Sequence, residues 1–124
     1  MSDTTLVTSD LINLYDAALL CGGFTVRLNA DGTITPAATG FAVSATDERR
    51  SVPVDVPFAD FASVVERLRT LYPTANAVGG WVDGQWLYLD PVEIIDDRSK
   101  AESLGRLRNQ IAIYDLSASE EIRL

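Results

Sequence analysis

The run AVGGWVDGQWLYLD, residues 77–90, limits the fold more strictly than any other part of the sequence. Its centre, Asp83-Gly84, is a strong signal for a two-residue hairpin turn. On both sides of the turn, apolar side chains alternate with the spacing that is typical of strands. The run therefore predicts two antiparallel strands, over residues 76–82 and 85–90.

Side-chain alternation gives this hairpin two different faces. With Asp83-Gly84 as the turn, Trp81 and Trp86 become cross-strand neighbours at a position without hydrogen bonds, where side chains come closest. One face is then aliphatic, and we expect it to lie against the core. The other face holds both tryptophans of the chain and a tyrosine. The aliphatic face consists of Val78, Val82, Leu87 and Leu89, and the aromatic face consists of Trp81, Trp86 and Tyr88.

The aromatic face has two open interpretations. In the first, a helix covers it, or the indoles stack and stabilise the hairpin by about 1 kcal/mol. In the second, it faces solvent and binds a partner, since Trp and Tyr contribute much of the energy at interface centres. We expect at least partial exposure of Trp86, because it flanks the turn at the rim of the sheet. Trp81, Trp86 and Tyr88 are therefore the candidate partner-binding residues.

Apolar periodicity predicts helices over residues 8–21 and 58–72. Thr8 or Ser9 is the expected N-cap of the first helix, and Gly22-Gly23 ends it. The second helix stops before Pro73. We expect both apolar faces to pack on one side of the sheet. These faces are Leu11, Leu14, Tyr15, Ala18 and Leu19 in the first helix, and Phe61, Val64, Val65, Leu68, Leu71 and Tyr72 in the second.

The remaining segments predict a third helix and further strands. The third helix begins at Asp96 or Asp97 and reaches about Arg108, where Asn109 suits a left-handed cap. Together these elements predict a single α+β domain over residues 1–124, with a mixed, mainly antiparallel sheet. Its last part is a strand–helix–strand unit, expected as a crossover that joins parallel neighbours. The further strands are a hairpin within residues 24–35, then 40–45, an edge strand or connector in 51–56, 92–96, 110–116 and the closing residues EEIRL.

Composition excludes several kinds of chemistry. The sequence has no histidine, so a His-based triad and a conventional zinc site are excluded, and we predict neither a metal nor a cofactor. The one cysteine, Cys21, falls at the C-terminal end of a helix, where the dipole disfavours a thiolate. We expect Cys21 to be buried and structural. The net charge of −8 disfavours direct binding to nucleic acid or anionic membranes.

The acids Asp90, Glu93, Asp96 and Asp97 lie close together in the sequence and allow an alternative interpretation. Carboxylates of this kind could hold a divalent metal or act as an acid/base pair. However, Asp90 precedes a proline at a turn, and an aspartate at a helix start is a cap. An enzyme that uses Asp90, Glu93 and Asp97 is therefore the alternative to a non-enzymatic protein.

Several motifs carry a resemblance to a known group of proteins. They are Gly79-Gly80-Trp81, Tyr88-Leu89-Asp90, Arg108-Asn109-Gln110, Ile113-Tyr114-Asp115 and Glu120-Glu121-Ile122. With them, the chain resembles small, largely uncharacterised proteins encoded by phages of actinobacteria and related mobile elements. The resemblance covers roughly residues 79–124 and, more loosely, 21–45. Trp86 departs from the shared pattern. The resemblance implies a phage context and a place inside the bacterial host.

These observations lead us to expect a non-enzymatic accessory protein that binds another protein, either a host or defence factor or one encoded by the phage. A minor virion component and a homo-oligomer stay open as alternatives. The N-terminus lacks the basic region of a secretory signal, and the longest apolar run is too short to span a membrane, so we expect a cytoplasmic location without membrane contact.

Overall fold

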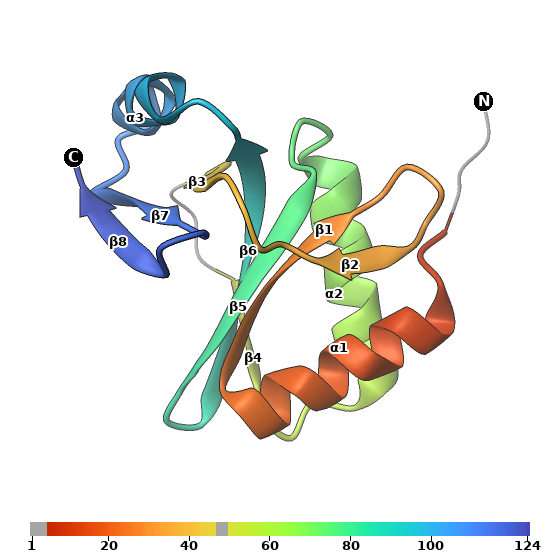
Figure 1. Ribbon diagram of the computed structural model, residues 1–124. Helices are drawn as coiled ribbons and strands as arrows, with labels where there is room; N and C mark the ends of the chain where they lie inside the picture. Colours follow the sequence, from red (N-terminus) through yellow and green to blue (C-terminus); the bar gives the residue numbers. More distant parts are fainter. Residues whose placement is uncertain (1–4, 47–49) are drawn as a thin grey trace.

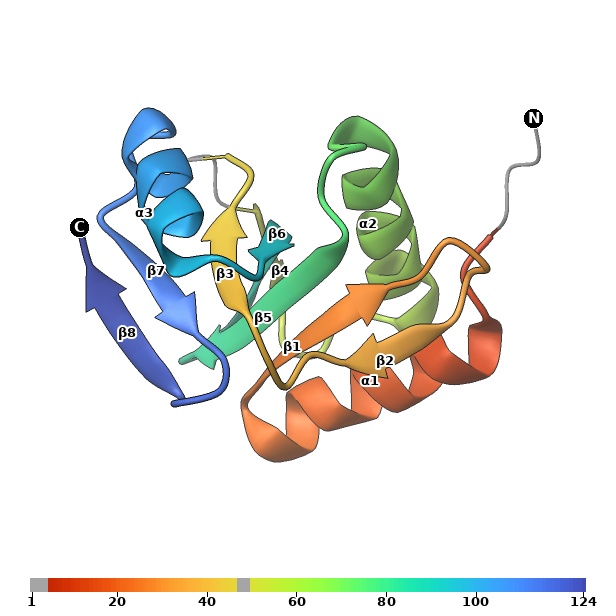
Figure 2. The ribbon, with the colours of Figure 1, turned by 45° about the horizontal axis from the view of Figure 1, so that its top comes forward.

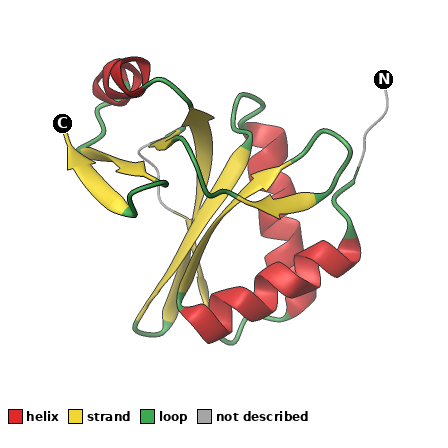
Figure 3. Cartoon of the chain, in the orientation of Figure 1, coloured by secondary structure: helices red, strands yellow, loops and turns green. Residues whose placement is uncertain are grey.

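The computed structural model describes residues 5–46 and 50–124 (Figure 1). These residues form three helices and eight strands, with loops between them. Helices and strands alternate irregularly along the chain, as Figure 3 shows. The predicted α+β class is confirmed. The elements are α1 (Thr8–Cys21), β1 (Gly23–Leu28), β2 (Ile34–Pro36), β3 (Phe41–Ser44), β4 (Arg50–Pro53), α2 (Phe58–Leu71), β5 (Ala77–Asp83), β6 (Trp86–Ile95), α3 (Arg98–Leu107), β7 (Ala112–Asp115) and β8 (Glu120–Arg123).

All eight strands belong to one sheet, with the order β2-β1-β5-β6-β3-β7-β8 and with β4 also paired to β6. Every strand pair in the described residues is antiparallel, so the expectation of a mixed sheet was wrong. The unit β6–α3–β7 does not join parallel neighbours either. Strand β3, from an earlier part of the chain, lies between β6 and β7 and pairs antiparallel with both.

Strand β6 runs unbroken through Pro91, where the sequence predicted two separate strands. The first half of β6 pairs with β4 and the second half with β3. Pro91 stands where the partner changes. Its carbonyl oxygen accepts a hydrogen bond from Ala45 N at 2.8 Å. The N–H that proline lacks would point to the same side, at the end of β3, so little ladder bonding is lost.

Two of the predicted helix ends are confirmed and one is wrong. Gly22 ends α1 in the left-handed conformation (φ 77°), as predicted. Asp97 caps α3 by accepting hydrogen bonds from Ser99 N and Lys100 N, as predicted. The start of α1 differs, because neither Thr8 nor Ser9 is the cap; the capping residue is Val7, and no side chain bonds the free N–H groups.

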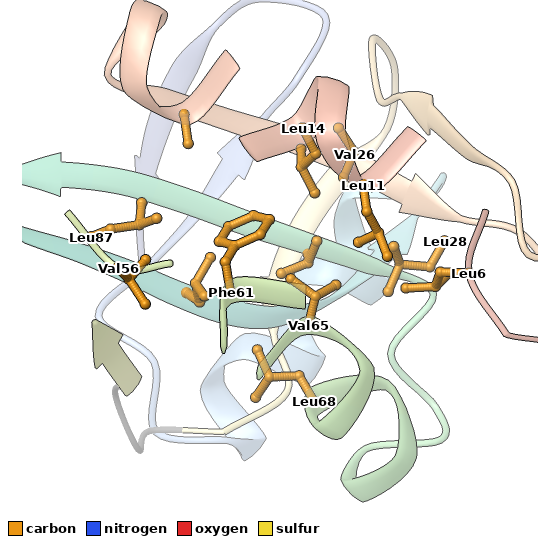
Figure 4. Close-up of a cluster of buried hydrophobic side chains, with 13 residues drawn as sticks. Leu6, Leu11, Leu14, Val26, Leu28, Val56, Phe61, Val65, Leu68 and Leu87 are labelled. Atoms are coloured by element: carbon orange, nitrogen blue, oxygen red, sulfur yellow. The ribbon is translucent and has the colours of Figure 1, made fainter. Parts of the chain in front are cut away.

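Helices α1 and α2 pack on one face of the sheet, as expected. Figure 4 shows Phe61 at the centre of this core, with Leu14 from α1 and Leu87 from β6 close by. Leu19 and Leu71, predicted to face the core, are instead about half exposed, because each lies in the last turn of its helix, past the final core contacts of Ala18 and Leu68.

Helix α3 covers the other end of the same face. Its Ala101 is buried with Val43 of β3 and Ile113 of β7. Val43 is the cross-strand partner of Glu93, and Glu93 alternates in phase with the buried Leu87 and Leu89 of the core face. By this alternation all three helices lie on one face of the sheet, and Figure 2 shows them around the twisted strands. The opposite face, called the open face below, has no helix over it in the described residues.

Packing on the helical face of the sheet leaves no room for a side chain at Gly80. Gly80 is the cross-strand partner of Phe24, and the phenylalanine ring lies directly over it. A Cβ atom at Gly80 would stand 2.5 Å from that ring. The neighbouring Gly79 points to the open face, where a Cβ would meet nothing nearer than 3.6 Å.

Candidate functional site

The β5–β6 hairpin turns one residue later than predicted. Asp83 pairs with Trp86, so Gly84 and Gln85 form the two-residue turn. Gly84 has a positive φ of 62°, whereas the φ of Gln85 is not positive. This pattern suits a type II′ turn, which places glycine at its first central position, whereas the predicted Asp-Gly turn of type I′ needs two residues with positive φ.

The later turn changes the partners of both tryptophans. Trp81 pairs with Tyr88 instead of Trp86, and the two rings stack with centroids 5.3 Å apart and planes 16° apart. Trp86 instead lies between Asp83 on one side and Pro53 of β4 on the other. The predicted Trp81–Trp86 pair was therefore wrong.

The predicted division into faces is nevertheless confirmed. The register differs from the prediction by two residues, and a shift of two leaves every side chain on its original face. Leu87 and Leu89 are buried in the core, and Trp81, Trp86 and Tyr88 share the open face. We call these three residues the aromatic face.

The aromatic face is in contact with solvent. Trp81 is 38% exposed and Trp86 is 48% exposed, which confirms the expected partial exposure of Trp86. Tyr88 is partly buried between Trp81 and the neighbouring strand β4. In the part of the chain that is described, no helix covers these rings. The two indoles do not stack on each other either, because Trp81 stacks on Tyr88, so both forms of the first interpretation were wrong.

A groove of about 860 Å³ extends from Trp81 along the open face. It lies between strands β1 and β5 on one side and the β7–β8 hairpin on the other. Its floor is low because Gly79 and Gly23 carry no side chains and Ala42 and Ala112 carry small ones. Side chains that line it include Thr25, Ser44, Trp81, Asp90, Gln110, Tyr114, Glu121 and Arg123.

Polar groups in the groove are already organised by the protein. Ser44 Oγ lies 2.7 Å from Asp90 Oδ1 and 2.6 Å from the carbonyl oxygen of Thr46, and it donates its single proton to one of them at a time. On the opposite wall, Arg123 Nε lies 3.4 Å from Glu121 Oε1. The groove therefore offers hydrogen-bonding groups beside an aromatic rim, an arrangement that can bind a ligand without changing it chemically.

The structure separates the carboxylates of the enzyme alternative. Asp90 lies on the open face, whereas Glu93 lies on the helical face and forms an ion pair with Arg108 at 2.7 Å. Asp97 is occupied as the cap of α3. No group of three or more metal-ligating His, Cys, Asp or Glu side chains occurs among the described residues.

Cys21 is exposed, contrary to the expectation that it is buried. The last residue of α1 in the core is Ala18, and the helix ends three residues later with Cys21 in solvent. Leu20 beside it is 85% exposed. The sequence did not predict the exposed end of α1 or the groove residues Tyr114 and Arg123. These features depend on how α1 and the β7–β8 hairpin lie against the β5–β6 hairpin, and no local sequence pattern specifies that arrangement.

No helix of the described residues is both long enough and apolar enough to cross a membrane. The chain matches no protein-family model, no curated protein and no solved structure at a significant level.

Proposed function

We propose that this chain is a binding protein that acts by docking another protein on its aromatic face. The observation that carries the proposal is the exposure of two indoles, 38% for Trp81 and 48% for Trp86, on a sheet face that no helix of the described residues covers. Trp and Tyr are the residues that most often dominate the binding energy at protein interfaces.

The rigidity of the aromatic face supports a binding role. Trp81 and Tyr88 are held against each other on paired strands, and Trp86 is bordered by strands on both sides. Side chains that are ordered before binding lose little conformational entropy when a partner arrives, which leaves more of the contact energy for affinity. Single exposed apolar side chains are common on protein surfaces, whereas three aromatic rings grouped on one face form a contiguous patch of the kind that marks an interaction site.

The biological setting of the proposal comes from the sequence motifs. The resemblance to proteins of actinobacterial phages and mobile elements suggests an accessory protein made inside the bacterial cytoplasm. Its partner would then be a host or defence factor, or another protein of the same element.

The experiment compares binding and stability in a single variant. The tagged protein and its Trp86→Ala variant are used to capture partners from a lysate of an actinobacterial host. We expect Trp86→Ala to weaken capture of a specific partner by about tenfold or more, as loss of an interface anchor does. Because Trp86 is about half exposed, its loss should lower the free energy of unfolding by about 1 kcal/mol or less.

Leu107→Ala is the matched control, because Leu107 is an equally apolar, 79% exposed residue at the end of α3. It should leave capture unchanged. Capture that survives Trp86→Ala, or that falls only as the folded fraction falls, would contradict the proposal.

A further inference from the structure

Strands β2, β4 and β8 each pair with one neighbour only in the described residues, so each presents an outer edge. The backbone N–H and C=O groups along such an edge can pair with a strand from another molecule. Two of the edges are interrupted. In β2, Ile34 N donates a hydrogen bond to Asp10 Oδ2 at 2.9 Å, and Pro36 has no N–H. In β4, an outward position is held by Pro53.

The outer edge of β8 has no such interruption. Figure 1 and Figure 2 both show β8 as the outermost strand at its end of the sheet. Leu124 N donates a hydrogen bond to Ile111 O at 2.9 Å, so this N–H points toward β7. Because N–H groups alternate along an antiparallel strand, Ile122 points the same way, whereas Glu121 and Arg123 point outward. Strand β8 contains no proline, so both outward residues offer an N–H and a C=O group to another strand.

The side chains of β8 decide which strand fits this edge. Glu121 and Arg123 are the cross-strand partners of Tyr114 and Ala112, so both side chains lie on the open face. Arg123 is 77% exposed and Glu121 is 61% exposed, and Arg123 Nε lies 3.4 Å from Glu121 Oε1. Like charges that face each other across a strand pair are destabilising. A fitting strand therefore places a base opposite Glu121 and an acid opposite Arg123.

A second copy of β8 meets this requirement when it runs antiparallel. With Ile122 opposite Ile122 of the second copy, Glu121 faces Arg123 and Arg123 faces Glu121. In this register the outward-pointing residues lie directly opposite each other and exchange both of their backbone hydrogen bonds. A shift by one residue places outward groups opposite inward ones, and a shift by two brings Glu121 against Glu121 or Arg123 against Arg123. The backbone and the charges therefore select the same register.

We infer that this protein forms a symmetric dimer in which the outer edges of two β8 strands pair antiparallel, centred on Ile122. The two-fold axis is perpendicular to the sheet, so the two sheets join and both open faces point to the same side. Arg123 of the second copy then lies beside Glu121 at the groove, which both of these residues line. The inference uses neither tryptophan and does not depend on the proposed function.

The dimer is expected to be weak. Strand β8 is four residues long, and a contact of this length covers less than the about 1,200 Å² of a stable complex. The net charge of −8 on each molecule opposes association, but at about 0.15 M ionic strength the repulsion is screened beyond about 8 Å. At this ionic strength we expect a dissociation constant of about 0.05–1 mM.

Two measurements on the purified protein test the inference. Analytical ultracentrifugation from about 0.01 to 2 mM should show a monomer that becomes a dimer as the concentration rises. NMR hydrogen exchange over the same range identifies the backbone groups that pair. The amide protons of Glu121 and Arg123 should become protected as the dimer forms, whereas that of Ile122, which points toward β7, should be protected throughout.

Charge variants test the register. Glu121→Arg places arginine opposite arginine, and Arg123→Glu places glutamate opposite glutamate, so either variant alone should self-associate about tenfold more weakly. In an equimolar mixture of the two variants, arginine faces glutamate at both positions, and a heterodimer about as stable as the original dimer should form. The double variant Glu121→Arg/Arg123→Glu also keeps opposite charges face to face and should dimerise by itself.

Glu120→Arg is the matched control for Glu121→Arg. Both substitutions change the net charge by the same amount, but the side chain of Glu120 points to the opposite face of β8 from the Glu121–Arg123 pairs. Glu120→Arg should therefore dimerise at least as well as the original protein. Trp86→Ala should leave the dimer unchanged, because Trp86 is not on β8. Circular dichroism verifies that each variant is folded.

Several outcomes would overturn the inference. They are a monomer at every concentration, a dimer in which the Glu121 and Arg123 amide protons stay unprotected, or a mixture of the two charge variants that does not associate. A dimer that Trp86→Ala dissociates would also overturn it, because the contact would then lie on the aromatic face.

Discussion

Replacing Leu68 by alanine tests the packing of α2 against the sheet. The Leu68 side chain is 1% exposed and belongs to the core that joins α1, α2 and the strands. The substitution removes three carbon atoms, and at about 0.8 kcal/mol for each buried carbon the lost transfer free energy is about 2.4 kcal/mol. The cavity left behind adds to this, so we expect a loss of about 2–5 kcal/mol in the free energy of unfolding.

Urea unfolding followed by circular dichroism measures the difference. Leu71→Ala is the matched control, because Leu71 is in the same helix, three residues further on, and is 51% exposed. It should cost less than about 1 kcal/mol, since it opens no closed cavity. If Leu68→Ala lowered the free energy of unfolding no more than Leu71→Ala does, with an unchanged m-value in urea, α2 would not be packed as described.

Three further predictions concern Gly80, Glu102 and Cys21. Gly80→Ala should lower the free energy of unfolding by about 1–3 kcal/mol, because the new methyl group would clash with the Phe24 ring. Gly79→Ala is the control and should be tolerated. Equal losses of stability in urea unfolding would refute the prediction. Arg98 donates a hydrogen bond to Glu102 at 2.8 Å and holds the pKa of that carboxyl below its ordinary value of 4.5, so the stabilising effect is complete above pH 4.5 and is lost as the pH falls through the lowered pKa. Carboxyl titration by NMR should show the Glu102 pKa rising toward 4.5 in Arg98→Gln, and an unchanged pKa would disprove the assignment. Exposed Cys21 should react with a thiol reagent in the native protein without denaturant, and Cys21→Ser should leave both stability and partner capture intact; a thiol that reacts only on unfolding would show that it is buried.

The aromatic face shows what alternation in a sequence can and cannot predict. Which side chains share a face depends only on whether their positions are odd or even, so Trp81, Trp86 and Tyr88 could be grouped correctly before their partners were known. Which side chains touch depends on the exact turn residues. Gly84 can take part in either an Asp83-Gly84 turn or a Gly84-Gln85 turn. The backbone forms the second turn, which needs a positive φ only at Gly84.

The order of the strands in the sheet could not be predicted from the sequence, for a different reason. Helix starts and ends are local events, and Gly22, Asp97 and Asn109 were assigned correctly from their own chemistry. The insertion of β3 between β6 and β7 is a contact between distant parts of the chain. Nothing in the residues of β3 marks which two strands it joins, and the same holds for the continuation of β6 through Pro91.

The sequence of the open face of β6 helps to distinguish the proposed binding surface from a core that is merely incompletely covered. Along this face the side chains change from Trp86 and Tyr88, through Asp90, to Val92 and Ile94. The two aliphatic residues are buried with Leu116, and only the aromatic end remains in solvent. A poorly covered core would expose aliphatic side chains like those at the other end of the strand. Here the cover stops where the sequence changes to indole and phenol rings, which can lie in water at one edge and bind apolar groups at the other. The exposure of the aromatic face therefore follows from the sequence of the strand, which supports the proposed binding role.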